Sequence, residues 1–125
     1  MTPAAPVRLG LGRAARLRQK REFVQIREHG RRVVKGCLIA NWTTLPPGAP
    51  SRLGVITTRK LGKAHVRSRA RRLLRESFRL HQQDLREPLA IVLIARASIL
   101  GRKLLEVERD YLSLLRQASL LKAHP

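Results

Sequence analysis

The residues from Arg59 to Arg79 read RKLGKAHVRSRARRLLRESFR and hold nine Lys or Arg but a single acid, Glu76. Seven of the nine are Arg, whose planar guanidinium binds phosphate oxygens in pairs and stacks on exposed bases. A solvated helix face usually mixes acids with bases, because like charges four residues apart repel one another. This segment lacks that balance, so we expect a polyanion outside the chain to offset the repulsion.

The charge of the whole chain points in the same direction. It has 27 Lys and Arg against 8 Asp and Glu, a formal charge of +19, which makes nucleic acid the natural partner and a membrane surface the weaker alternative. No apolar run approaches the ~20 residues that span a bilayer. The first residues are rich in Arg and free of acids, as in a transit peptide, but they contain almost no Ser. We therefore expect a cytoplasmic protein with no membrane partner.

Side chains that could carry hydrolytic chemistry are sparse. A metal-dependent nuclease needs carboxylates that converge on divalent ions ~4 Å apart, whereas the one local acidic cluster, Glu106 to Asp110, has Arg102 and Arg109 beside it, which predicts surface ion pairs. The four histidines have no evident partner, and Cys37 is the only cysteine, so we expect no disulfide and no cysteine-based metal site. We assign catalysis to no side chain and expect the protein alone to bind no metal or other cofactor.

The basic segment must be positioned by a folded domain, and 125 residues with 43% hydrophobic content suffice for one. We expect a mobile basic arm over residues 1–15 and a single domain over 16–121. Periodicity and turn residues predict, in order, a helix over 16–29 closed by Gly30 at its C′ position, a strand over 31–45 with Gly36 as a candidate break, a strand over 52–58, a helix over 66–85, a buried strand over 89–95 and a last helix after Ser98. The order α-β-β-α-β-α is that of an α+β sandwich.

The helix over 66–85 has two faces when it is drawn at 100° per residue. The face that should pack on the sheet carries Ala70, Leu73, Leu74, Ser77 and Phe78. The other side is basic, and the residues before the helix lie near its N-terminal amides, which favour phosphate. Ser68 is either an exposed hydroxyl or a group that binds a phosphate or hydrated ion. The candidate RNA-binding residues are Arg59, Lys60, Lys63, His65, Arg67, Ser68, Arg69, Arg71, Arg72, Arg75 and Arg79.

RNA is favoured over DNA, because the sequence has no zinc-finger spacing, no heptad-linked basic region and no convincing helix-turn-helix. Phe23 and Trp42 are candidates for stacking on unpaired bases, a mode typical of single-stranded RNA recognition, although plain core packing is an equal alternative for each. Phe78 and Tyr111 lie on apolar helix faces and should be core.

The segment TTRKLGKAHVRSRARRLLRESFR, residues 57–79, closely resembles the signature region of the bacterial ribonuclease P protein subunit. In that family a strand ends in a basic pair, followed by a glycine turn, an Arg-Asn-Arg triplet and a helix that reads Lys/Arg-Arg-Leu-x-Arg-x-x-Phe. Arg67-Ser68-Arg69 matches the triplet with Ser in place of Asn, and the residues from Arg71 to Phe78 match the helix in order. The resemblance extends to Leu17 with REF at 21–23, HG at 29–30, RLGV at 52–55 and IAR at 94–96. Arg27 stands where a second aromatic is common, and either Asn41 or Trp42 matches the family's cleft-lining aromatic.

The resemblance implies a ribosomal-S5-domain-2-like α+β sandwich, with a mostly antiparallel sheet and a left-handed β-α-β crossover in place of the usual right-handed one. It implies the protein subunit of an endoribonuclease in which a catalytic RNA removes 5′ leaders from precursor tRNA, using Mg²⁺ held largely by that RNA. The protein, a monomer on its own, would bind this RNA through the basic helix and the leader through a cleft between the first helix and the sheet. The implied cleft residues are Phe23, Arg27, Ile39, Asn41 and Trp42.

Two other classes of protein compete with this interpretation. A ribosomal protein or general RNA chaperone would need the basic patch but not the spacing of strand, turn and triplet. A stand-alone RNA nuclease or modifying enzyme would need converging acids, which the sequence does not offer.

Overall fold

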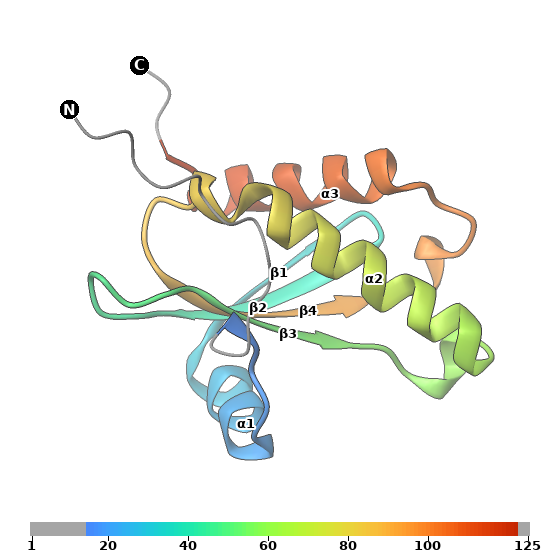
Figure 1. The fold of residues 1–125 in the computed structure, drawn as a ribbon, viewed down its shortest axis with the longest axis horizontal. Helices are drawn as coiled ribbons and strands as arrows, with labels where there is room; N and C mark the ends of the chain where they lie inside the picture. The colour runs from blue at the N-terminus through green and yellow to red at the C-terminus, as the bar shows by residue number, and fades with distance from the viewer. Residues whose placement is uncertain (1–14, 123–125) are drawn as a thin grey trace, which may run out of the picture.

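The chain folds into a sheet with helices on both faces (Figure 1). The structure is a computed structural model that describes residues 15–122, so the predicted arm over 1–15 lies, apart from Ala15, outside the described residues. α2 and α3 lie on one face of the sheet and α1 on the other. The elements are α1 (Lys20–His29), β1 (Arg31–Lys35), β2 (Leu38–Thr44), β3 (Arg52–Ile56), η2 (Arg59–Leu61), α2 (Ala64–His81), η3 (Gln82–Asp84), β4 (Leu89–Ala95), η4 (Ala97–Ile99) and α3 (Leu104–Gln117).

The sheet has the strand order β1-β2-β4-β3. β2 pairs antiparallel with both β1 and β4, whereas β3 pairs parallel with β4. α2 connects the two parallel strands, as a parallel pair requires a crossover connection. The predicted α+β class, the mostly antiparallel sheet and the β-α-β unit are therefore confirmed, while the left hand of the crossover stays a prediction.

The element order contains one more strand than the sequence predicted, because the stretch over 31–45 is a hairpin. Lys35 faces Leu38 across the turn, and Gly36 has a φ of 55°, a left-handed conformation that glycine adopts at no steric cost. The possible break near Gly36 is thus confirmed. The observed order is α-β-β-β-α-β-α.

β4 forms the centre of two cores. Its residues Leu89, Ile91 and Leu93 are fully buried in the larger core against α2 and α3, while Ala90 and Val92 face the smaller core under α1. A strand that is buried on both faces reads as a continuous apolar run, so the prediction of a buried, non-edge strand is confirmed. Within the described residues no helix is both long and apolar enough to cross a membrane.

α1 begins four residues later than predicted, because the chain before it pairs with β3. Arg16 forms a parallel bridge with Leu53, and the Leu17 amide donates a hydrogen bond of 2.8 Å to the Leu53 carbonyl. Gly30 closes α1 as predicted, but as the C-cap residue with an extended φ of −87° and ψ of 173° rather than as a left-handed C′ residue. Glycine is needed there for close approach: a Cβ would lie 2.3 Å from the Ile26 carbonyl oxygen.

Candidate nucleic-acid interface

α2 presents the two faces that its sequence predicted. Its buried residues are Ala70, Leu73, Leu74, Ser77 and Phe78. Ser77 is tolerated in the core because its hydroxyl donates a hydrogen bond of 3.0 Å to the Leu73 carbonyl, which satisfies the buried polar group. The arginines lie on the opposite side of the helix, so the apolar face fixes the direction in which they point.

Five arginines surround a hollow of about 410 Å³ beside α2, which we call the arginine hollow. Four of them come from α2, and Arg16 comes from the segment that pairs with β3. The hollow is lined by Arg16, Ser68, Arg71, Arg72, Arg75, Glu76 and Arg79.

The charges of the arginine hollow are only partly balanced. Arg79 donates hydrogen bonds to the carboxylate of Glu76, which lower the pKa of that carboxyl group. Burial, followed by the charges of Arg16 and Arg71, lowers the pKa of Arg75, and Arg75 has no carboxylate partner among residues 15–122. Guanidinium groups held together in this way attract an anion with several acceptor oxygens.

Two neighbours hold Arg71 at the rim of the arginine hollow. Its guanidinium donates hydrogen bonds of 2.7 Å to the Thr57 hydroxyl and 3.1 Å to the Ser68 hydroxyl. The Ser68 hydroxyl is exposed and contacts Arg71, so both alternatives for Ser68, a plain surface hydroxyl and a group that binds a phosphate or hydrated ion, remain predictions. Thr57 was not predicted as part of this site.

The remaining predicted RNA-binding residues lie at or before the first turns of α2. Arg59, Lys60, Lys63 and His65 are exposed there, and Arg67 is half-buried. Arg69 points toward the start of α3, where it donates a hydrogen bond of 2.7 Å to the Arg102 carbonyl. His65 and Arg69 line a separate hollow beside η4 (Ala97–Ile99), so they do not border the arginine hollow.

A second hollow, of about 200 Å³, lies between α1 and the sheet, where the resemblance implied a cleft. We call it the α1 cleft. Phe23 and Arg27 line it from α1, as predicted, and Asn41 lines it from β2. Its floor is apolar and three basic side chains surround it. The full lining is Lys20, Phe23, Val24, Arg27, Arg32, Asn41, Ile56, Val92 and Ile94.

The register of β2 decides between the two candidates for the cleft-lining residue. Trp42 is 3% exposed and packs in the larger core with α2 and α3, so its assignment to the cleft was wrong. Asn41 faces the cleft instead, and its side-chain amide donates a hydrogen bond of 2.7 Å to the Arg31 carbonyl. Ile39 shares the face of Asn41, because side chains alternate along a strand, but it lies beyond the cleft lining.

Sequence reasoning missed several basic residues of these two hollows. Arg32 and Lys20 line the α1 cleft, and Arg16 lines the arginine hollow. Lys20 precedes Phe23 by three residues and Arg27 by seven, spacings that place all three on one side of a helix, so helical spacing could have found it. Arg16 carried no such signal, because its position depends on long-range pairing with β3.

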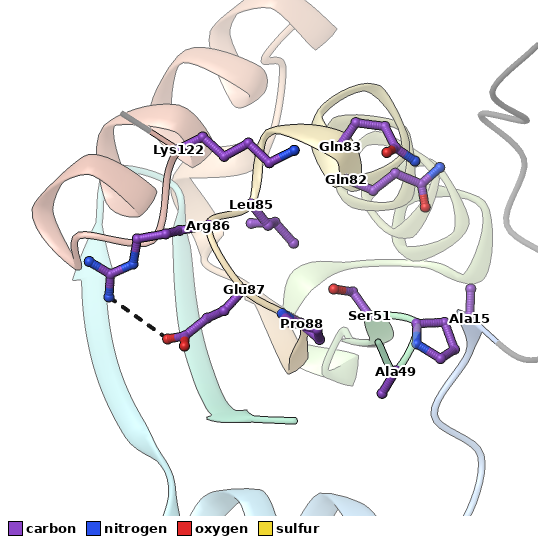
Figure 2. Close-up of a pocket in the computed structure, with 11 residues that line it drawn as sticks. Ala15, Ala49, Ser51, Gln82, Gln83, Leu85, Arg86, Glu87, Pro88 and Lys122 are labelled. Atoms are coloured by element: carbon purple, nitrogen blue, oxygen red, sulfur yellow. Dashed lines mark ion pairs between the residues drawn. The ribbon is translucent and has the colours of Figure 1, made fainter. Parts of the chain in front are cut away.

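A separate hollow of about 330 Å³ lies where α2 ends and β4 begins (Figure 2). Gln82 and Gln83 point into it from η3, and Arg86 and Glu87 form an ion pair of 3.8 Å at its edge. None of the predicted RNA-binding or cleft residues lines it. It therefore lies outside the predicted interface.

The acidic residues of α3 serve the fold. Arg102 and Glu106 form the predicted ion pair at 3.3 Å, while Asp110 accepts a hydrogen bond of 2.9 Å from the Cys37 amide in the β1–β2 turn. Between residues 15 and 122 no three His, Cys, Asp or Glu side chains come together as a metal site would require.

Comparison with known proteins gives one consistent result. The family model for ribonuclease P matches residues 11–119. The ribonuclease P protein component of Symbiobacterium thermophilum is 36% identical over 110 residues, which cover 88% of this chain and 96% of the relative. The RNase P protein from Thermotoga maritima superimposes with a TM-score of 0.72 at 29% identity, over 82% of this chain and 96% of that one.

The fold also matches that of the RNase P protein from Staphylococcus aureus, with a TM-score of 0.76 at 23% identity, over 87% of this chain and 99% of that one. The family match spans the whole described domain apart from its last residues, including α2 and the α1 cleft. This chain belongs to the ribonuclease P protein family.

Proposed function

We propose that this ribonuclease P protein assembles in the cytoplasm with a catalytic RNA, binds the 5′ leader of precursor tRNA and promotes endonucleolytic removal of that leader. The observation that carries the proposal is the presence of two basic surfaces of different character. The arginine hollow lies beside α2, and the α1 cleft lies on the opposite face of the sheet.

The arginine hollow suits the backbone of folded RNA. Arg72 is exposed and has no hydrogen-bond or ion-pair partner among the described residues, and Arg75 is similarly unpaired. Their repulsion is relieved when phosphate groups replace the missing carboxylates, and the release of counterions from RNA adds to the affinity. Guanidinium groups bind phosphate oxygens wherever the RNA backbone presents them, which suits recognition of shape and backbone.

The α1 cleft suits a single strand. Phe23 and the aliphatic floor offer a surface on which an unpaired base can stack, while Lys20, Arg27 and Arg32 surround it with positive charge. A duplex keeps its bases stacked inside, so a narrow cleft of this kind selects RNA whose bases are free. A leader that extends from the 5′ end of tRNA meets this requirement.

We assign no step of the hydrolysis to a side chain of this protein. The described residues provide no cluster of carboxylates or imidazoles for a metal ion, so the metal-dependent chemistry belongs to the RNA in our proposal. When bound there, Mg²⁺ would activate the attacking water and stabilise the leaving oxygen. The contribution of the protein is to hold the RNA and the leader in position.

Reconstitution tests the proposal. Purified protein, catalytic RNA and their mixture are each incubated with labelled precursor tRNA at low Mg²⁺, with mature tRNA as the control. We expect leader removal by the mixture, little by the RNA and none by the protein. Cleavage by the protein alone would indicate a nuclease, and binding without any gain in leader removal would indicate a general RNA chaperone or ribosomal protein.

A further inference from the structure

The arginine hollow and the α1 cleft are joined by a third, smaller hollow at the edge of β3. This junction hollow measures about 100 Å³. It shares Arg16 and Arg75 with the arginine hollow and Phe23 with the α1 cleft. The two surfaces are therefore linked around the edge of β3 by residues that they share with the junction hollow.

The backbone of Arg16 is fixed at this junction. Its carbonyl accepts a hydrogen bond of 3.1 Å from Arg52, and the next residue, Leu17, pairs with Leu53 of β3. Arg52 is itself neutralised by Glu22 at 3.2 Å. The side chain of Arg16 is exposed, with no carboxylate partner within residues 15–122.

Arg75 reaches the same hollow from α2. It is half-buried, and the charge of Arg16 is the largest electrostatic contribution to the lowered pKa of its guanidinium, after burial. Two cations from separate segments are thus held near each other with no acid between them. An anion placed between them would remove the repulsion and accept hydrogen bonds from both.

Gly54 leaves the space in which the Phe23 ring lies. A Cβ at this position would lie 2.5 Å from Cε1 of Phe23 and 3.3 Å from Cδ1 of Leu17. The absence of a side chain lets the Phe23 ring lie directly on β3, next to the two arginines. A base stacked on Phe23 then has its own backbone close to the junction hollow.

We infer that Arg16 and Arg75 together bind one backbone phosphate of the single-stranded leader where it crosses the edge of β3, so that the two surfaces form one continuous RNA track. The inference rests on the proposed function, because it takes the leader as the strand in the α1 cleft. It adds a phosphate site and gives a role to Arg16, which lies outside the Arg-rich signature segment.

The test uses the holoenzyme and precursor tRNA whose leader carries one uncharged methylphosphonate linkage, moved stepwise along the leader. For the wild-type protein we expect one linkage at which affinity falls about tenfold, as the loss of a charge-assisted contact should cause. Arg16→Ala should weaken binding of the unmodified leader about tenfold and show no further loss at that linkage. Arg18→Ala is the matched control, because it removes one exposed charge two residues away and should keep the sensitive linkage.

The outcomes separate failure of the phosphate site from failure of the proposed function. If Arg16→Ala keeps the same sensitive linkage as the wild type, or if Arg16→Ala and Arg18→Ala lose affinity equally at every linkage, the phosphate site is wrong although leader binding stands. If the wild-type holoenzyme removes no leader, the proposed function and the phosphate site fall together. Equal melting temperatures of the wild type, Arg16→Ala and Arg18→Ala would show that the three affinities are measured on equally folded proteins.

Discussion

The ring of Phe23 lies against the Cα of Gly54, at a distance that leaves no room for a Cβ. This contact joins α1 to the edge strand β3 and limits how closely the Phe23 ring, which also lines the α1 cleft, approaches that strand. It also means that Phe23 is half-buried rather than freely exposed. Phe23 therefore combines both of the roles that its sequence position suggested, since one part of the ring packs and another lines the cleft.

Gly54→Ala should displace the Phe23 ring. An added Cβ would lie 2.5 Å from Cε1, so we expect a loss of about 1–3 kcal/mol in the free energy of unfolding, as overpacking costs, together with weaker leader binding. Urea unfolding and leader affinity measure the two effects. Adding Phe23→Leu to Gly54→Ala should recover stability but not leader affinity. Failure to recover stability would show that the clash with the Phe23 ring is not the cause of the loss.

Phe23→Ala should distinguish leader-bearing from leaderless tRNA. Stacking on an aromatic side chain is worth about 1–3 kcal/mol per base, so the holoenzyme should lose up to about one to two decades of affinity for precursor tRNA, with little change for mature tRNA and little dependence on salt. Ile26→Ala on the same helix is the control. Ile26 is 3% exposed and outside the cleft lining, so its loss should lower stability without a leader-specific effect. Equal losses for both tRNAs would contradict the cleft assignment of Phe23.

Arg72→Ala should weaken binding of the catalytic RNA in a salt-dependent way. Loss of one phosphate contact should make the plot of log affinity against log salt shallower by about 0.7–0.9, while the melting temperature stays unchanged because the side chain is exposed. Arg109→Ala on α3, also exposed, removes the same charge and should leave the slope nearly unaltered. Phe78→Ala on the buried face of α2 should instead cost about 3–5 kcal/mol of stability. An unchanged slope for Arg72→Ala would exclude this arginine from the interface.

Cys37 should make the fold less stable at alkaline pH. Burial, aided by the Asp110 carboxylate, raises the pKa of the Cys37 thiol from 9.0 to about 12. Below about pH 9 the thiol is neutral in both states and its contribution is constant; above that pH the unfolded chain ionises first, so stability falls by up to about 1.4 kcal/mol per pH unit until the folded pKa is reached. Urea unfolding between pH 8 and 11 measures the slope, which should be smaller in Cys37→Ala. Equal slopes would show that the thiol ionises alike in both states.

How far the sequence determines the site differs between its two surfaces. The buried and basic faces of α2 follow from helical spacing alone, because every residue from Ala70 to Phe78 keeps its angular position whatever the helix packs against. The residue that β2 turns toward the cleft depends on where the strand starts after Gly36, and a shift of one residue exchanges Asn41 for Trp42. Arg16 could not be placed from local pattern, because pairing with β3 across 37 positions (53 − 16) is what stops α1 from extending to it.

That pairing also protects the sheet from self-association. β3 is an outer strand, and an outer strand exposes backbone groups that can recruit a strand of another molecule and begin aggregation. Arg16 and Leu17 occupy part of this outer edge, and the other outer strand, β1, carries Arg31, Arg32 and Lys35 as exposed charges that repel a copy of themselves. A chain shortened to begin at Arg18 would lose the pairing of Arg16 and Leu17 with β3. Without bound RNA, it should form intermolecular β-sheet more readily than the full chain.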